Sequence, residues 1–122
     1  MLKHLSYRRA CIVSALIAVL IGILSLTPMD VLPDVPGTDK VHHLIAYMVL
    51  AIPTSLAKVR SIKLLAPLYV TYGGVIEVIQ PYVNRHGEML DFGVNTLGVV
   101  IGSVVGIVIN KKMMQPRLTP IL

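Results

Sequence analysis

The stretch Asp91–Gly106, DFGVNTLGVVIGSVVG, carries polar residues and glycines on one face of an apolar helix. Residues three or four positions apart share a helix face. The residues at this spacing are Asp91, Asn95, Gly98, Gly102 and Gly106. Small residues four apart let two membrane helices approach closely. If the glycine face packs against a neighbouring helix, Asp91 and Asn95 also point into the protein and away from lipid.

The composition of the whole chain is that of a membrane protein. Of its 122 residues, 55% are hydrophobic and 14% are charged, whereas a soluble domain carries about 25% charged residues. Four apolar runs approach the roughly 17–25 residues that a spanning helix needs, and Pro-, Gly- or Lys-containing breaks separate them. The runs cover about residues 10–26, 41–57, 64–80 and 92–109. We predict an all-α polytopic membrane protein, a single domain over residues 1–122 that forms a four-helix transmembrane bundle.

The basic residues predict an orientation. The net charge is +5, but Lys and Arg stand in short groups between the apolar runs, so we expect no nucleic-acid partner. The positive-inside rule counts Lys and Arg near the ends of the spans. With the N-terminus in the cytoplasm, every Lys and Arg except Lys40 and Arg85 lies on the cytoplasmic side. We predict that both termini are cytoplasmic and that the first run remains an uncleaved helix.

Polar residues gather at the predicted outer ends of three helices. In the second run Asp39, His43 and Tyr47 follow at four-residue spacing, and Glu77 shares a face with Gly73 in the third. Arg85, in the loop before the fourth run, is tethered close enough to pair with Glu77 or Asp91. We expect a polar ligand-binding site made of Asp39, Lys40, His43, Tyr47, Glu77, Gln80, Arg85, Asp91 and Asn95.

Glu77 argues most strongly for a functional site. A carboxylate in hydrocarbon is unfavourable by a few kcal/mol or more, and such residues usually face the protein interior and mark a functional site. At about 1.5 Å per residue, Glu77 lies roughly 5 Å inward of Gln80. We therefore expect Glu77 to be shielded from lipid near the outer membrane surface.

Structural interpretations of these residues stay open. Asp39 and Asp91 stand at helix starts, where carboxylates cap exposed amides, and all the polar residues together fit a purely structural network. The candidates for catalysis are His43, Glu77 and Asp91. The same three residues could bind a metal, but no spacing is diagnostic of one, so we predict neither a metal nor a cofactor. No P-loop, G-x-S-x-G, H-E-x-x-H or CxxC motif occurs in the sequence.

Three blocks of the chain have a recognisable order and spacing: DKVHHLIAY from Asp39, YGGVIEVIQ from Tyr72, and RHGEMLDFGVNTLGVVIG from Arg85. They resemble the VanZ-like family of small bacterial integral membrane proteins. The pattern of that family is roughly D-K-x-x-H-x-x-x-Y, then Y-[GA]-x-x-x-E-x-x-Q, then R-x5-D-x3-N-x2-G. The resemblance covers about residues 36–106, and Glu88 departs from it by standing where a small polar residue is often found.

The resemblance implies a multi-pass protein of the bacterial cytoplasmic (inner) membrane. The namesake of the family is associated with low-level resistance to the glycopeptide teicoplanin. We expect a cell-envelope factor that binds or modifies a lipid-linked anionic group, with Lys40 and Arg85 contacting phosphate. Its partner would be a membrane lipid or a lipid-linked cell-wall intermediate.

Three versions of this function stay open at the level of sequence. In an enzyme, His43 would act as general base or nucleophile on a phosphoester. In a binding or shielding protein, the network would be structural. In a small proton-coupled transporter subunit, Glu77 would titrate, and a chain of this length would need to form a homo-oligomer.

Overall fold

The computed structural model describes residues 6–27, 39–83 and 89–114 of the chain. Within these ranges the protein is all-helical, as predicted. The α-helices are α1 (Tyr7–Leu26), α2 (Asp39–Ala57), α3 (Ile62–Ile79) and α4 (Met89–Ile109). Shorter turns flank α3 over Val59–Ser61 and Gln80–Val83, and a π turn over Asn110–Met114 follows α4. The helices begin up to three residues before the apolar runs of the sequence and end within one residue of them.

Three of the four described helices are long and apolar enough to cross a membrane. They are α1, α3 with its flanking turns (Val59–Val83), and α4 extended to Met113. Large apolar side chains stay exposed along their outer faces, among them Leu16, Leu64 and Val78. Soluble monomers rarely expose such continuous apolar surface. The described part of the chain is therefore suited to a lipid environment.

The fourth predicted span, α2, does not meet that criterion. Its first turns carry Asp39, Lys40, His42 and His43, which interrupt an otherwise apolar helix. α2 contacts each of the other three helices, and its contact with α4 is the most extensive. These neighbours cover much of the polar surface of α2.

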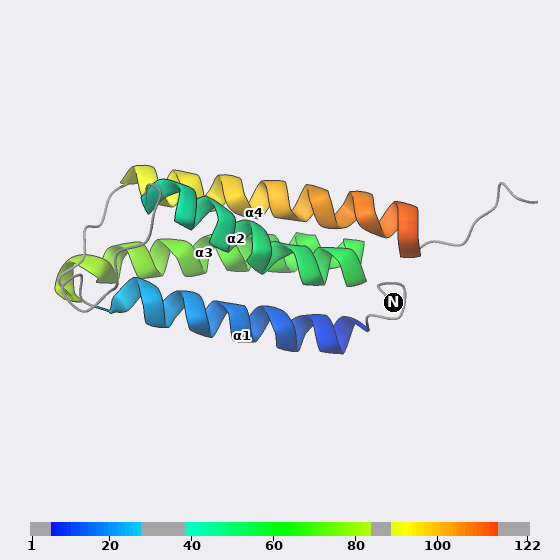
Figure 1. Cartoon of the computed structure of the whole chain (residues 1–122), viewed down its shortest axis with the longest axis horizontal. Helices are drawn as coiled ribbons and strands as arrows, with labels where there is room; N and C mark the ends of the chain where they lie inside the picture. Colours follow the sequence, from blue (N-terminus) through cyan, green and yellow to red (C-terminus); the bar gives the residue numbers. More distant parts are fainter. Residues whose placement is uncertain (1–5, 28–38, 84–88, 115–122) are drawn as a thin grey trace, which may run out of the picture.

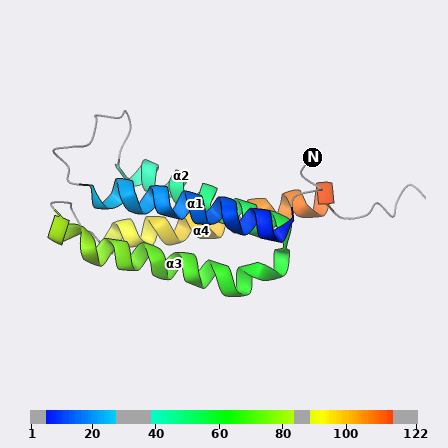
Figure 2. The ribbon, with the colours of Figure 1, turned by 90° about the horizontal axis from the view of Figure 1, so that it is seen from below.

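The four helices lie side by side (Figure 1). α1 and α4 lie on opposite sides in Figure 1, and α2 and α3 lie on opposite sides when the molecule is seen from below (Figure 2). The last turns of α1 and α3 lie at the same end of the molecule as the first turns of α2 and α4 (Figure 1). That is the end to which the sequence assigns the polar residues.

The core is centred on α2. Tyr47, Leu50 and Ala51 are almost inaccessible, and they pack with Val99 of α4 and Ile76 of α3. Lipid tails are as apolar as this core, so close packing and hydrogen bonds between helices, and not the hydrophobic effect, hold membrane helices together. The geometry of the contacts around α2 is therefore what positions the polar site.

Candidate functional site

Glycines bring α4 directly against α2. A Cβ atom on Gly98 would lie 2.7 Å from the carbonyl oxygen of Leu44 and 3.0 Å from the Cβ of Tyr47. A Cβ on Gly102 or Gly106 would also collide with α2. Larger residues at these positions would push the two helices apart. The prediction that the glycine face packs against a neighbouring helix is confirmed, and α2 is that neighbour.

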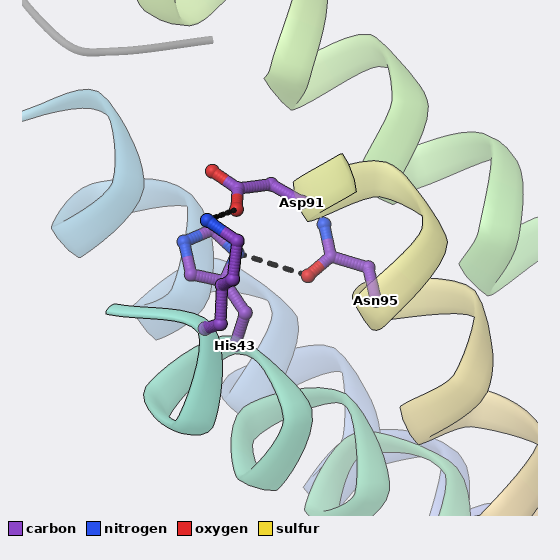
Figure 3. A network of polar contacts seen from close by, with 4 residues as sticks. His43, Asp91 and Asn95 are labelled. Carbon is purple, nitrogen blue, oxygen red and sulfur yellow. Dashed lines mark hydrogen bonds and ion pairs between the residues drawn. The ribbon is translucent and has the colours of Figure 1, made fainter. Parts of the chain in front are cut away.

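The same face of α4 buries two polar side chains at its start. Asp91 is 2% exposed and Asn95 is 1% exposed. Figure 3 shows both side chains turned toward the first turns of α2, where His43 lies. The glycine contact thus delivers a carboxylate and an amide to the polar turn of α2.

His43 and Asn95 form a hydrogen bond between α2 and α4 (Figure 3). The Nδ1 of His43 lies 2.9 Å from the Oδ1 of Asn95. A carbonyl oxygen only accepts hydrogen bonds, so in this arrangement His43 donates its Nδ1–H. In the neutral ring the lone pair then resides on Nε2. Asn95 therefore fixes the orientation of the imidazole. Histidines that act as bases or metal ligands are commonly oriented by such a hydrogen bond at the other ring nitrogen.

Lys40 and Asp91 form an ion pair one helical turn nearer the end of the molecule. The Nζ of Lys40 lies 3.4 Å from the Oδ1 of Asp91, with side chains 39% and 3% exposed. Asp91 also stands in the first turn of α4, where the helix dipole favours negative charge. Lys40 and the N-terminal end of the α4 dipole thus both balance the negative charge of Asp91. Asp91 in turn holds the ammonium group of Lys40, whose side chain is partly exposed.

Two buried donors of this cluster have no hydrogen-bond partner among the described residues. They are the hydroxyl of Tyr47 and the Nδ2 amide of Asn95. Both side chains lie against Gly73 of α3: a Cβ there would be 3.2 Å from the Tyr47 ring and 3.4 Å from the Asn95 Nδ2. Gly73 therefore lets α3 close over the seam between α2 and α4 while leaving both donors in place.

Glu77 lies on the same face of α3, one turn beyond Gly73. It is 8% exposed, and the buried face of α3 runs through Tyr69, Gly73, Ile76 and Glu77. Gly73, on the same buried face of α3, lies against Tyr47 and Asn95. The structure thus shields Glu77 inside the protein, as expected, next to the α2–α4 cluster.

Gln80 faces a different neighbour. Its Nε2 donates to the backbone carbonyl of Ser25 in α1 at 3.1 Å, while its buried Oε1 has no hydrogen-bond partner in the described part of the chain. The sequence assigned Gln80 to a site made by the last three helices. The structure connects it to α1, so the first helix also borders this end of the molecule.

The packing face of α1 is a structural contact that was not among the predicted features of the chain. Ala10, Ser14, Ala18 and Gly22 are small residues at four-residue spacing, the same signal that identified the face of α4. Ala10 and Ser14 are buried, and Ser14 Oγ donates to the carbonyl of Leu50 in α2 at 2.9 Å. The spacing was available in the sequence and would have predicted that this face of α1 packs against another helix.

Two predicted site residues cannot be placed. Arg85 and the side chain of Asp39 lie outside the described residues. Over the ranges 6–27, 39–83 and 89–114, no three His, Cys, Asp or Glu side chains come together in a way that could hold a metal ion.

The described site is formed by α2, α3 and α4. It contains the imidazole of His43, the ion pair between Lys40 and Asp91, the buried carboxylate of Glu77, and two buried donors, the Tyr47 hydroxyl and the Asn95 Nδ2. Such a set can bind an oxyanion and can accept a proton at His43. Comparison with known proteins adds no identity to this geometry: no known family, no curated protein and no solved structure matches the chain.

Proposed function

We propose that this chain is a VanZ-like integral membrane protein of the bacterial cell envelope, and that its polar site binds or modifies a lipid-linked anionic group. The three blocks that begin at Asp39, Tyr72 and Arg85 support the family. The proposal includes a four-helix transmembrane bundle in the bacterial cytoplasmic membrane, with both termini in the cytoplasm and the polar site at the outer leaflet. The distribution of Lys and Arg supports that orientation.

The observation that carries the proposal is the pair of unpartnered donors. A buried polar group without a hydrogen bond destabilises a protein by about 1–3 kcal/mol. The Tyr47 hydroxyl and the Asn95 Nδ2 are both buried, and neither has a hydrogen-bond partner among the residues that the structure describes. Such groups in a native protein call for an explanation, and a bound water, ion or ligand that completes them is one. Both can donate, so the group that completes them is an acceptor, and a phosphate oxygen is a strong one.

The charges around these donors suit a phosphate as long as Lys40 remains paired with Asp91. Asp91 is paired with Lys40 at 3.4 Å, so its negative charge is balanced where a phosphate would approach. Arg85, in the third sequence block, would supply a second cation for the phosphate. Asp91 then positions Lys40, and Lys40 contacts the anion from the surface side.

The same site offers a chemical step. With its Nδ1–H donated to Asn95, neutral His43 accepts at Nε2 the proton of a water molecule that attacks phosphorus. The bond between phosphorus and the leaving oxygen breaks, and the leaving oxygen takes up a proton. A protein that only binds or shields the lipid would use the same donors without this step.

Thermal unfolding of the purified protein in detergent tests binding. We expect polyprenyl phosphate to raise the unfolding temperature and the uncharged polyprenol to leave it unchanged. A ligand at 100 times its Kd stabilises by about 2.7 kcal/mol. Tyr47→Phe and Asn95→Leu should abolish the shift. If no phosphorylated lipid shifts the wild-type protein, the site is a structural network.

Phosphate release from the same lipids tests the chemical step. We expect His43→Ala to lose turnover while it keeps part of the thermal shift. If His43→Ala turns over as fast as the wild type, His43 is not the base. A topology reporter fused at position 85 tests the orientation, and a cytoplasmic signal there would overturn the whole arrangement. Teicoplanin susceptibility of cells that express the wild type or Tyr47→Phe tests the link to resistance.

A further inference from the structure

A hollow lies in the half of the molecule away from the polar site and extends to the middle of α1 and α3. It is a groove of about 330 Å³ between α1, α2 and α3, and its lining is almost entirely apolar. The residues that define its walls are Cys11, Ala15, Ala18, Thr54, Leu65 and Leu68. α1 and α3 are both suited to cross a membrane, so the groove faces the hydrocarbon.

The polar groups along this groove already have partners. Ser14 donates to the carbonyl of Leu50 at 2.9 Å, and the hydroxyls of Thr54 and Tyr69 lie 2.8 Å apart. The hydroxyl of Tyr72 donates to the carbonyl of Ala18. Because these groups need no further hydrogen bonds, the groove suits an occupant made of hydrocarbon.

The membrane-surface end of the groove is basic. The Nζ of Lys58 lies 4.9 Å from the centre of the Tyr7 ring, and Tyr7 lies close to Cys11, which lines the groove. Arg8 is exposed and stands three residues before Cys11, so the two residues share a face of α1. Two cations therefore stand at the mouth of an apolar groove.

No Asp or Glu stands near Arg8 or Lys58 in the sequence to balance their charge. All six Asp and Glu residues occur at positions 30, 34, 39, 77, 88 and 91, and the described ones lie at the polar-site end. Arg60 and Lys63 add two exposed positive charges beside Lys58. An occupant with an anionic head matches this end, and a hydrocarbon chain matches the groove that leads from it.

We propose that the groove binds one acyl chain of an anionic phospholipid of the adjacent leaflet, with its phosphate between Arg8 and Lys58. The groove itself gives little preference among lipids, because a chain leaves one apolar environment for another. The selectivity comes from the head group. A basic residue near an anionic membrane surface favours binding about 5-fold, so two of them favour an anionic over a zwitterionic lipid about 30-fold.

Fluorescence quenching by brominated lipids tests this site in the intact protein. The chain has no Trp, so a single introduced Trp reports on one position. Leu68→Trp places it on the wall of the groove, at a side chain that is 55% exposed. Val104→Trp is the matched control on α4, at a side chain that is 53% exposed and at a similar distance from the basic end of its helix.

Each reporter is reconstituted in phosphatidylcholine vesicles that contain either brominated phosphatidylglycerol or brominated phosphatidylcholine. We expect the Leu68→Trp reporter to be half-quenched at an about 30-fold lower fraction of the anionic lipid. The Val104→Trp reporter lies near the exposed Lys111 and Lys112 but beside no such groove, so it should show a smaller preference that changes at Arg8 and Lys58 leave unaltered. Adding Arg8→Gln and Lys58→Gln should remove the preference at Leu68→Trp. Both changes are at exposed positions, so they should leave the fold intact.

Two results would overturn the proposed head-group site. One is an equal lipid preference at both reporters, which would mean that no site exists at the groove. The other is a preference that survives Arg8→Gln with Lys58→Gln, which would place the head group elsewhere. Ala15→Phe tests the chain separately: it should fill the groove and weaken quenching at Leu68→Trp, and undiminished quenching would show that the chain lies outside the groove.

Discussion

Replacing Gly98 by Ala adds one methyl group where α4 touches α2. The new Cβ would lie 2.7 Å from the Leu44 carbonyl oxygen and 3.0 Å from the Tyr47 Cβ. Neither neighbour is the flexible tip of a side chain, so the helices must separate. Extra methyl groups in a well-packed interior destabilise by about 1–3 kcal/mol. Ala is also the better helix former, by roughly 0.5–1 kcal/mol, which partly hides that loss.

Gly93→Ala is the control that removes the second effect. It makes the same chemical change in the same helix, at an exposed position with no atom within 4 Å of the added Cβ. We expect Gly93→Ala to be neutral or slightly stabilising. Gly98→Ala should be less stable than Gly93→Ala by the full packing loss, about 1–3 kcal/mol.

Unfolding in mixed detergent micelles, followed by circular dichroism, measures this difference. The two variants are compared at the same micelle composition, so that the contributions of helix propensity and of solvent to the unfolding free energy cancel in the difference. If Gly98→Ala and Gly93→Ala unfold at the same denaturant fraction, α4 does not pack on α2 through Gly98. The orientation of Asp91 and Asn95 toward His43 would then lose its structural basis.

Three further substitutions test the polar contacts with the same unfolding measurement. Tyr47→Phe should raise the stability of the ligand-free protein by about 1 kcal/mol, because its buried hydroxyl has no hydrogen-bond partner in the described structure; a loss of stability would reveal one. Lys40→Met should destabilise more than Asp91→Asn, because the first leaves a carboxylate that is 3% exposed and the second leaves an ammonium that is 39% exposed; the reverse order would refute the pairing. Asn110→Ala should destabilise by about 1–3 kcal/mol, since the Nδ2 of Asn110 donates to the Leu56 carbonyl at 2.7 Å in the last turn of α2. Hydrogen exchange should then quicken in that turn, and unchanged exchange would contradict the capping role.

The helices and the inward face of α4 could be predicted because each depends on local pattern. An apolar run between breaks predicts a membrane helix whatever surrounds it. Glycines four apart predict a close contact, and Asp91 and Asn95 share that face by their spacing alone. The burial of Glu77 followed because an exposed carboxylate in lipid is too unfavourable to persist.

The choice of neighbours could not be predicted in the same way. Spacing tells which face of a helix is special, but it does not tell which other helix covers that face. Gln80 shares a face with Gly73 by count, yet its amide bonds α1 through the Ser25 carbonyl. The hydrogen bond between His43 and Asn95 and the ion pair between Lys40 and Asp91 likewise depend on how far α4 slides along α2. The glycine contacts set that offset in three dimensions.

The polar first turn of α2 has a consequence for how the chain is made. α2 is the least apolar of the four described α-helices, and α4, which pairs with its Lys40 and His43, is synthesised after it. At roughly 5–20 residues per second, the stretch from Ala57 to Ile109 takes about 3–10 s to emerge from the ribosome. During that interval α2 has no α4 to cover its charged turn. The charged turn of α2 therefore lacks these contacts until α4 has emerged, and a chain truncated before α4 should be a substrate for membrane proteases.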